Sequence, residues 1–145
     1  TSQFKKNPQI YFDQLGNDED LFFGSATNQS YVWDQVFTGT NENLLNSLKY
    51  YDYIELPPIS SFQYMIDSNH VTLDELKFLY KDLISKAKSL NKMCVAVSDC
   101  RYIYNYQRLI HEIYIEAPTL GGGLHWLKKK PSHPEFRYLT PPSDR

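Results

Sequence analysis

The chain has 145 residues, which is enough for one compact domain with a hydrophobic core. Its formal net charge of −2 excludes a general electrostatic attraction to nucleic acid, so any contact with DNA would have to be local. No apolar run approaches the roughly 18 residues of a membrane span. Two cysteines are too few for a disulfide framework, and we therefore expect a reducing, cytoplasmic location.

The first part of the chain carries signals for a strand followed by two helices. Residues 21–26 form an apolar run that ends in small side chains, which predicts a buried strand. Asn28 is placed to cap the next helix, and Gly39 is expected to end it. A second helix, with an apolar stripe of leucines, is expected to begin at Thr40 or Asn41.

The middle of the chain predicts two further strands on either side of a long helix. Residues 51–56 read as a strand that ends at Pro57 and Pro58, because proline cannot donate to a β-ladder. Residues 72–75 (TLDE) form a capping box, and the apolar spacing continues the helix to about residue 91. Residues 93–97 are the next expected strand.

The order of these elements predicts the fold class. Strands that alternate with helices indicate an α/β protein with a mainly parallel sheet and right-handed crossovers. Residues 103–116 are ambiguous, although Ile103, Gln107, Ile110 and Tyr114 would share one face of a helix. Beyond Pro118 the sequence is irregular.

The loop that follows the strand expected at residues 93–97 is the first candidate site. The apolar run ends abruptly in Ser98, Asp99, Cys100 and Arg101. Functional side chains collect at the carboxyl ends of parallel strands in α/β sheets and βα barrels. We therefore expect this loop to lie at a site.

Other chemistry-bearing residues form weaker patterns. The four histidines, which show neither an HxH pair nor an HExxH motif, are read as ordinary surface or partly buried residues: His70, His111, His125 and His133. Cys94 lies inside an apolar run and is read as a small core residue. There is no GxSxG nucleophile elbow and no phosphate-binding glycine loop.

A short basic run near the C-terminus is the candidate contact for DNA. Lys128, Lys129 and Lys130 follow Trp126 closely, and such a group can meet a phosphate backbone. Short basic runs are more often solvated surface, so both interpretations stay open.

Several stretches resemble one known family, in the family's order. Residues 21–28 (LFFGSATN) are similar to its "LLIGSACNEGE", and residues 50–58 (YYDYIELPP) to its "FYDYIEVQPP". Residues 95–103 (VAVSDCRYI) resemble "VATGNVHYL". Residues 109–111 (LIH) and 136–137 (FR) resemble "ILIH" and the start of "FRTT". The chain thus resembles the C-terminal part of the PHP (polymerase and histidinol phosphatase) domain of PolC-type bacterial DNA polymerase III, over roughly residues 8 to 140.

The resemblance implies a fold and a domain organisation. The expected architecture is part of a distorted βα barrel of the PHP type, with a mainly parallel sheet and flanking helices. Residues 1–140 would form the C-terminal segment of the PHP domain, and residues 141–145 would lead toward the polymerase part. The proofreading 3′–5′ exonuclease and the HxH motif of the family would precede this segment, and the polymerase carboxylates would follow it.

The chain departs from the family at two metal-ligand positions. The family's cysteine ligand corresponds to Thr27, and its histidine ligand corresponds to Arg101. A hydroxyl is a weak ligand and a guanidinium is none, although Asp99 could still offer oxygen. We therefore expect a degenerate metal site, without bound metal or catalytic residues in this segment, in which Arg101 pairs with a carboxylate such as Asp99.

The expected function is that of a scaffold segment in a replicative DNA polymerase. The parent chain would synthesise DNA with Mg²⁺, while this segment binds no cofactor and catalyses nothing. Its partners would be the rest of the same chain, DNA through that chain, the sliding clamp and other replisome proteins, but no membrane. Two alternatives stay open: a metal-dependent phosphoesterase or exonuclease, and a pure protein-interaction module. A strand edge left uncovered could also cause self-association.

Overall fold

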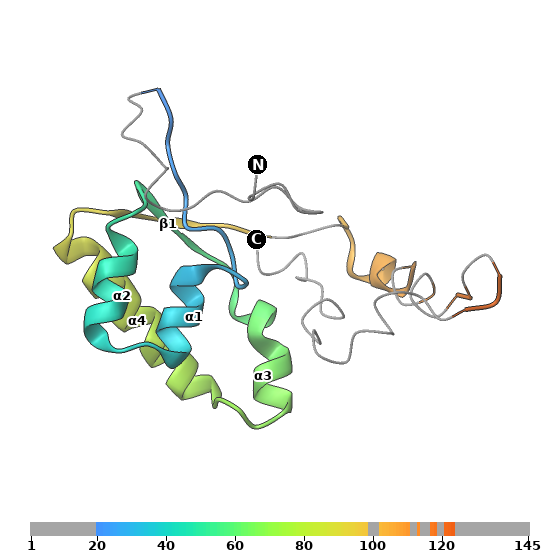
Figure 1. Ribbon diagram of the computed structural model, residues 1–145. Helices are drawn as coiled ribbons and strands as arrows, with labels where there is room; N and C mark the ends of the chain where they lie inside the picture. Colours follow the sequence, from blue (N-terminus) through green and yellow to red (C-terminus); the bar gives the residue numbers. More distant parts are fainter. Residues whose placement is uncertain (1–19, 99–101, 111–112, 114–116, 119–120, 124–145) are drawn as a thin grey trace.

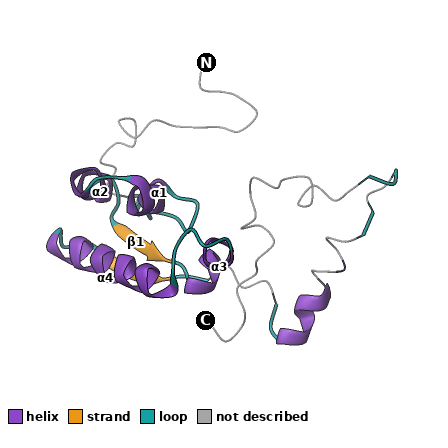
Figure 2. Cartoon of the chain, turned by 90° about the horizontal axis from the view of Figure 1, so that it is seen from below, coloured by secondary structure: helices purple, strands orange, loops and turns teal. Residues whose placement is uncertain are grey.

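The computed structural model describes residues 20–98, 102–110, 113, 117–118 and 121–123. Most of these residues form a small α/β body, shown as ribbons in Figures 1 and 2. Its elements, in chain order, are α1 (Tyr31–Thr38), α2 (Asn41–Leu48), β1 (Tyr53–Leu56), η2 (Ile59–Phe62), α3 (Gln63–Asp67), α4 (Leu73–Ser89), β2 (Met93–Ala96) and η3 (Asn105–Gln107). Among the described residues, none of the helices has the length and apolar character that crossing a membrane requires.

The sheet of the described chain is parallel. Strands β1 and β2 pair in parallel, with Tyr53 opposite Met93 and Leu56 opposite Ala96. A parallel bridge joins Gly24 to Tyr53 on the other side of β1. The prediction of an α/β fold with a parallel sheet is thus confirmed, whereas the described residues, whose sheet has two strands, do not show the expected partial βα barrel.

One face of this sheet is packed by helices. Figure 1 shows α1, α2 and α4 on the same side of β1, and Figure 2, which is seen from that side, shows α1 and α2 next to each other and α4 alongside them. The side chains at the centre of this layer are fully buried: Val32, Trp33, Leu48, Ile54, Phe62, Leu76, Leu83 and Ala87. Burial of these apolar groups is the main term that holds the body together.

The expected strand at residues 21–26 is wrong as an element. Only the Gly24 bridge remains of it, and Leu21 and Phe22 are exposed. The Phe23 amide donates to the Asp52 carboxylate at 2.7 Å, and the Phe23 carbonyl accepts from the Asp52 amide at 2.8 Å. A side chain has therefore taken over part of the pairing that a regular ladder would provide.

The cap of the first helix differs from the prediction. Ser30, not Asn28, is the N-cap of α1, because its hydroxyl accepts from the Trp33 amide at 3.4 Å. The end of α1 at Gly39 and the start of α2 after the Thr40 cap are confirmed. Gly39 has an extended φ of −82°, so its role is steric: an added Cβ would lie 2.7 Å from the Gln35 carbonyl oxygen.

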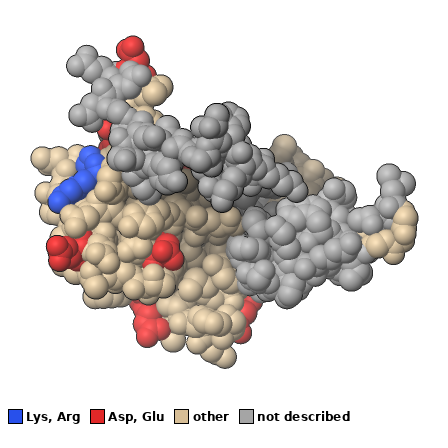
Figure 3. All heavy atoms as spheres, in the orientation of Figure 1, with Lys and Arg blue, Asp and Glu red and all other residues tan. Residues whose placement is uncertain are grey.

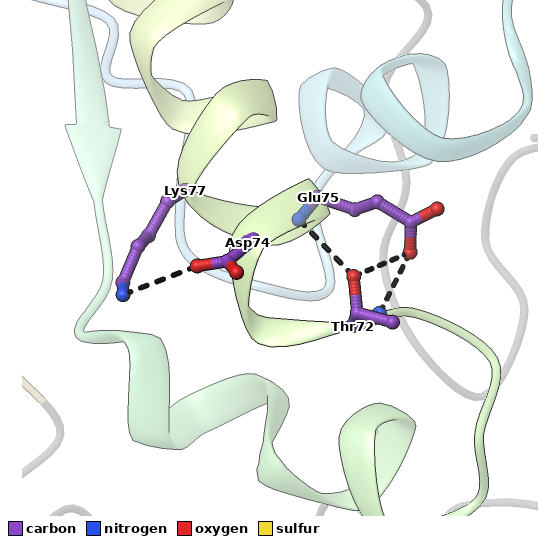
Figure 4. A network of polar contacts seen from close by, with 4 residues as sticks. All are labelled: Thr72, Asp74, Glu75 and Lys77. Atoms are coloured by element: carbon purple, nitrogen blue, oxygen red, sulfur yellow. Dashed lines mark hydrogen bonds and ion pairs between the residues drawn. The ribbon is translucent and has the colours of Figure 1, made fainter.

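Helix α4 confirms the most specific local prediction. The Thr72 hydroxyl accepts from the Glu75 amide at 3.2 Å, and the Glu75 carboxylate accepts from the Thr72 amide at 2.8 Å, as Figure 4 shows. Asp74 pairs with Lys77 in the same turn at 3.5 Å. These bonds satisfy amides that a helix start would otherwise leave without partners, and acidic groups there favour the helix dipole.

Strand β2 lies where it was expected but is not buried as expected. Met93 and Ala96 are exposed, and Cys94 and Val95 are half-buried. Among the described residues β2 pairs with β1 alone, so no described strand lies along its outer edge. Two elements without a predicted counterpart, η2 and α3, fill the connection between β1 and α4.

Candidate functional site at the carboxyl edge of the sheet

Three parallel stretches of chain end at one edge of the sheet. The bridge of Gly24 with Tyr53 and the register of Tyr53 with Met93 align the segment around Gly24, β1 and β2. The amide of Val97 donates to the Leu56 carbonyl at 3.0 Å and carries the pairing of β2 one residue further. The turn at residues 26–30 and the start of the loop after β2 therefore lie at the same carboxyl edge, where ligand sites of open α/β sheets lie.

Ser25 attaches the first stretch to β1. Its amide donates to the Tyr53 carbonyl at 3.2 Å, and its hydroxyl oxygen accepts from the Glu55 amide at 2.9 Å. The hydroxyl donates in turn to the Ala26 carbonyl at 3.3 Å. Ser25 is almost fully buried, so this side chain continues the sheet pairing where the backbone turns away.

Gly24 is the position where the neighbouring strand approaches most closely. A Cβ on Gly24 would lie 2.4 Å from Cζ of Tyr53 and 2.7 Å from Oε1 of Glu55. These side chains project from β1 on the same face, because they are two residues apart in a strand. The phenol ring and the carboxylate therefore lie over the backbone of the first stretch.

The turn after Ser25 is strained. Ala26 has a φ of +60°, in the left-handed region that costs a non-glycine residue about 1–2 kcal/mol. The Thr27 carbonyl then accepts from the Ser30 amide at 2.9 Å and leads the chain into α1. Strained residues are often found at functional sites, and this one directly precedes Thr27, which the resemblance marks as an altered ligand position.

Thr27 is the predicted site residue that the structure places. It is half-buried in the turn at the carboxyl edge of the sheet. The side-chain amide of the following residue, Asn28, donates to the Ser61 carbonyl at 3.5 Å and links the turn to η2. Thr27 supplies a neutral hydroxyl here, which is a weak metal ligand.

The other predicted site residues lie outside the described residues. These are Asp99 and Arg101, together with Cys100, and the basic run Lys128, Lys129 and Lys130. The described chain after β2 ends at Ser98, beside the same sheet edge as Thr27. The pairing of Arg101 with Asp99 therefore stays a prediction, as does contact of the lysines with DNA.

The described residues do not by themselves assemble a metal site. Within them, no group of three or more His, Cys, Asp and Glu side chains converges. His70 is exposed in the turn before α4, where its Nδ1 lies 2.7 Å from the Ser68 hydroxyl, which confirms the reading of a surface loop histidine. The other histidines, His111, His125 and His133, lie outside the described part of the chain.

Cys94 is packed against the core as the sequence predicted. It lies on β2 among partly buried apolar side chains, and its thiol is free. Burial raises the pKa of this thiol, and the nearby positive charge of Lys88 offsets this increase in part. A thiol with a raised pKa is a weak nucleophile, which fits a packing role.

A cluster of aromatic side chains packs next to the end of β1 and was not predicted as part of the site. The Tyr80 hydroxyl donates to the carbonyl of the buried residue Pro57 at 2.6 Å, so α4 holds the end of β1. The ring centroids of Trp33 lie 4.7 Å from those of Phe62 and Tyr80. Burial raises the pKa of Tyr80. In the sequence, the helical spacing of Tyr80 on the apolar face of α4 was the signal that could have predicted its burial.

Two buried polar atoms in this region have no hydrogen-bond partner in the described structure. They are Nε1 of Trp33 and Oγ of Ser60. Buried groups of this kind usually have a protein or water partner, so they mark the least satisfied part of the core.

The described part of the face shown in Figure 3 carries few charged side chains. Most of it is neither basic nor acidic, with a few separate acidic groups and one small basic area at the upper left. Binding of a phosphate backbone relies on clustered Lys and Arg, and the described part of this face shows no large cluster of that kind.

The chain is similar in sequence to several curated proteins of one name. No protein-family model and no solved structure matches the chain. Among curated proteins, the DNA polymerase III PolC-type of Mycoplasmopsis pulmonis is 31% identical over 125 residues, which cover 86% of this chain. The proteins of the same name from Ureaplasma parvum and Lactococcus lactis are 22% and 30% identical and align with 96% and 86% of it.

The matched part of each relative is small. The chain spans 9% of the length of the Mycoplasmopsis protein, 10% of the Ureaplasma protein and 8% of the Lactococcus protein. Similarity at 22–31% identity over most of this chain indicates common descent with that part of the relatives. The chain is therefore a distant homologue of a segment, about a tenth in length, of PolC-type DNA polymerase III.

Proposed function

We propose that the chain is the C-terminal segment of the PHP domain of a PolC-type DNA polymerase III and acts there as a non-catalytic scaffold. Residues 1–140 form this segment, and residues 141–145 lead toward the polymerase part. The proposal is based on the alignments with polymerases of that name, which cover 86–96% of this chain at 22–31% identity. The parallel α/β body and the position of Thr27 at its carboxyl edge support it.

The absence of catalysis in this segment follows from the chemistry of its residues. A PHP site binds divalent ions at the carboxyl ends of the strands. Where the family has a cysteine ligand, this chain has Thr27, which offers a hydroxyl. Arg101 would add a fixed positive charge where the family has a histidine ligand. These residues do not fit a metal cluster, and an ion pair of Arg101 with Asp99 would take its place.

The parent chain supplies the chemistry in this proposal. It extends a primer in a template-directed reaction that uses Mg²⁺ at the polymerase carboxylates, and it carries a 3′–5′ exonuclease. Its partners are DNA, the sliding clamp and other replisome proteins, and it works in the cytoplasm.

The decisive experiment uses the full-length parent protein. We expect template-dependent primer extension, and no stoichiometric Mn²⁺ or Zn²⁺ bound outside the polymerase site after dialysis and elemental analysis. A matched variant with Thr27→Cys and Arg101→His restores the family's ligand types and should increase the retained metal. Failure of primer extension would overturn the polymerase assignment. Stoichiometric metal at the PHP site, with Mn²⁺-dependent phosphodiester hydrolysis, would establish the phosphoesterase alternative.

A further inference from the structure

A second helical region of the chain presents an apolar surface. Residues 105–107 form the 3₁₀ turn η3, and helix follows at residues 108–110 and 113. The Ala117 amide donates to the Ile113 carbonyl at 2.9 Å, which is the spacing of an α-helical bond. Tyr106, Leu109, Ile110 and Ile113 recur at helical spacing, and we refer to these four side chains as the Tyr106 stripe.

The Tyr106 stripe is uncovered in the described structure. Its side chains are between 59% and 68% exposed. Figure 1 shows this stretch in orange, apart from the body formed by α1–α4. Figure 2 shows it as a short helix that is also apart from that body. Next to the stripe, Tyr104 stacks on Tyr106 with centroids 5.7 Å apart and an interplanar angle of 6°, and Ile103 is also exposed.

This arrangement needs a partner for a physical reason. Short isolated helices are marginal in water, and helices in proteins owe most of their stability to an apolar face that packs on another surface. Contiguous exposed apolar side chains on a folded protein mark interaction surfaces. The stripe has no charged member, so the surface that covers it is also apolar.

We propose that the Tyr106 stripe is an interdomain surface, through which this segment docks on another part of the same polymerase polypeptide. The proposal rests on the proposed function. The length of the relatives indicates what covers the stripe. The segment homologous to this chain makes up only 8–10% of each relative, so most of the polypeptide lies outside it. The alignment with the Ureaplasma protein covers 96% of this chain, so the stripe has a counterpart inside a far longer polypeptide.

The first test compares hydrogen exchange in two proteins. Amides of residues 106–113 are followed in the 145-residue chain and in the full-length parent. We expect at least tenfold slower exchange in the parent, because docking covers the stripe and stabilises its helix. Equal exchange in the two proteins would overturn the proposal.

The second test removes the apolar surface in the parent. Leu109→Asp combined with Ile113→Asp should abolish the protection of residues 106–113 while α4 stays protected. Phe78→Asp is the matched control, since Phe78 is an equally exposed apolar residue, 68% exposed, on α4 outside the stripe. A combined Leu109→Ala and Ile113→Ala variant should give a smaller loss and serves if the charged variant does not fold. Protection that survives both double variants, or that Phe78→Asp removes equally, contradicts the docking.

Other occupants give different results. If the 145-residue chain alone gains protection at residues 106–113 as it dimerises in sedimentation, a second copy covers the stripe and the proposal fails. Primer extension by the same parent preparation reports on the proposed function separately. A parent that extends primers but leaves the stripe unprotected overturns only the docking, whereas a parent without polymerase activity overturns the proposed function.

Discussion

Helix α4 and the second helical region, described at residues 105–110 and 113, have the same kind of apolar periodicity, but their apolar side chains differ in burial. The apolar residues of α4 that face the core, Leu76, Leu83 and Ala87, are fully buried. Leu109 and Ile113 of the second stretch are mostly exposed. The comparison shows that apolar periodicity indicates which face of a helix is to be covered, but not whether the covering surface lies in the same chain.

The largest expected difference between the two regions is in the free energy of unfolding. Leu83→Ala should lower it by about 2–5 kcal/mol, because the cavity forms in a closed core. Leu109→Ala, made in the same 145-residue chain, should change it by less than about 0.5 kcal/mol. Urea denaturation followed by circular dichroism measures both. Equal losses for the two variants would mean that the stripe is covered within this chain.

The two regions also differ in what a tyrosine hydroxyl does. Tyr80→Phe removes the bond to the Pro57 carbonyl and leaves a buried acceptor unsatisfied, so we expect a loss of about 1–2 kcal/mol. Tyr106→Phe keeps the ring that stacks on Tyr104 and should leave the free energy of unfolding unchanged. Thermal melts of both variants are the measurement. An unchanged melting temperature for Tyr80→Phe would show that α4 does not hold the end of β1.

The start of α4 gives a smaller effect. Thr72→Ala removes the hydroxyl that accepts from the Glu75 amide and should cost about 1 kcal/mol. Ser85→Ala, at an exposed position inside the same helix, is the control and should be neutral or slightly stabilising. Chemical denaturation distinguishes the two. A loss for Ser85→Ala as large as that for Thr72→Ala would argue against capping as the cause.

The smallest effect is a dependence on pH. The hydrogen bond from the Thr72 amide, and then that from its hydroxyl, lower the pKa of Glu75 below its ordinary value of 4.5. A lowered pKa in the folded state stabilises the fold above 4.5, and this contribution is lost as the pH falls through the lowered value. Glu75→Gln should therefore flatten the acid side of the stability profile. A variant that follows the wild-type slope below pH 4.5 would contradict this assignment.

Local signals in the sequence predicted much of the body. The capping box at Thr72 and Glu75 defines the start of α4 by short-range hydrogen bonds alone, and the prolines after Leu56 end β1 by the same kind of local rule. The caps of α1 show the limit of such rules. Asn28 and Ser30 are both good caps, and Ser30 takes the role because Thr27 and Asn28 are held in the turn from the sheet.

Whether Thr27 belongs to a site stays a prediction. The structure places it in the turn after the Gly24 bridge, at the carboxyl edge of the parallel pairing, although the regular strand expected before it does not form. The Ser25 bond to β1 and the Tyr80 bond to Pro57 join residues 30 and 23 positions apart, and no local pattern indicates such contacts. Strand 21–26 was overpredicted for the same reason, since a partner carboxylate, Asp52, replaced part of its ladder.

The sequence by itself determined helices α1, α2 and α4 and the parallel α/β class. Periodicity, caps and side-chain chemistry are properties of neighbouring residues, so they can be read along the chain. The tertiary structure alone decided which apolar faces are covered. Burial of Leu83 and exposure of Ile113 depend on which distant segments pack together, and that depends on the free energy of the whole assembly and not on local sequence.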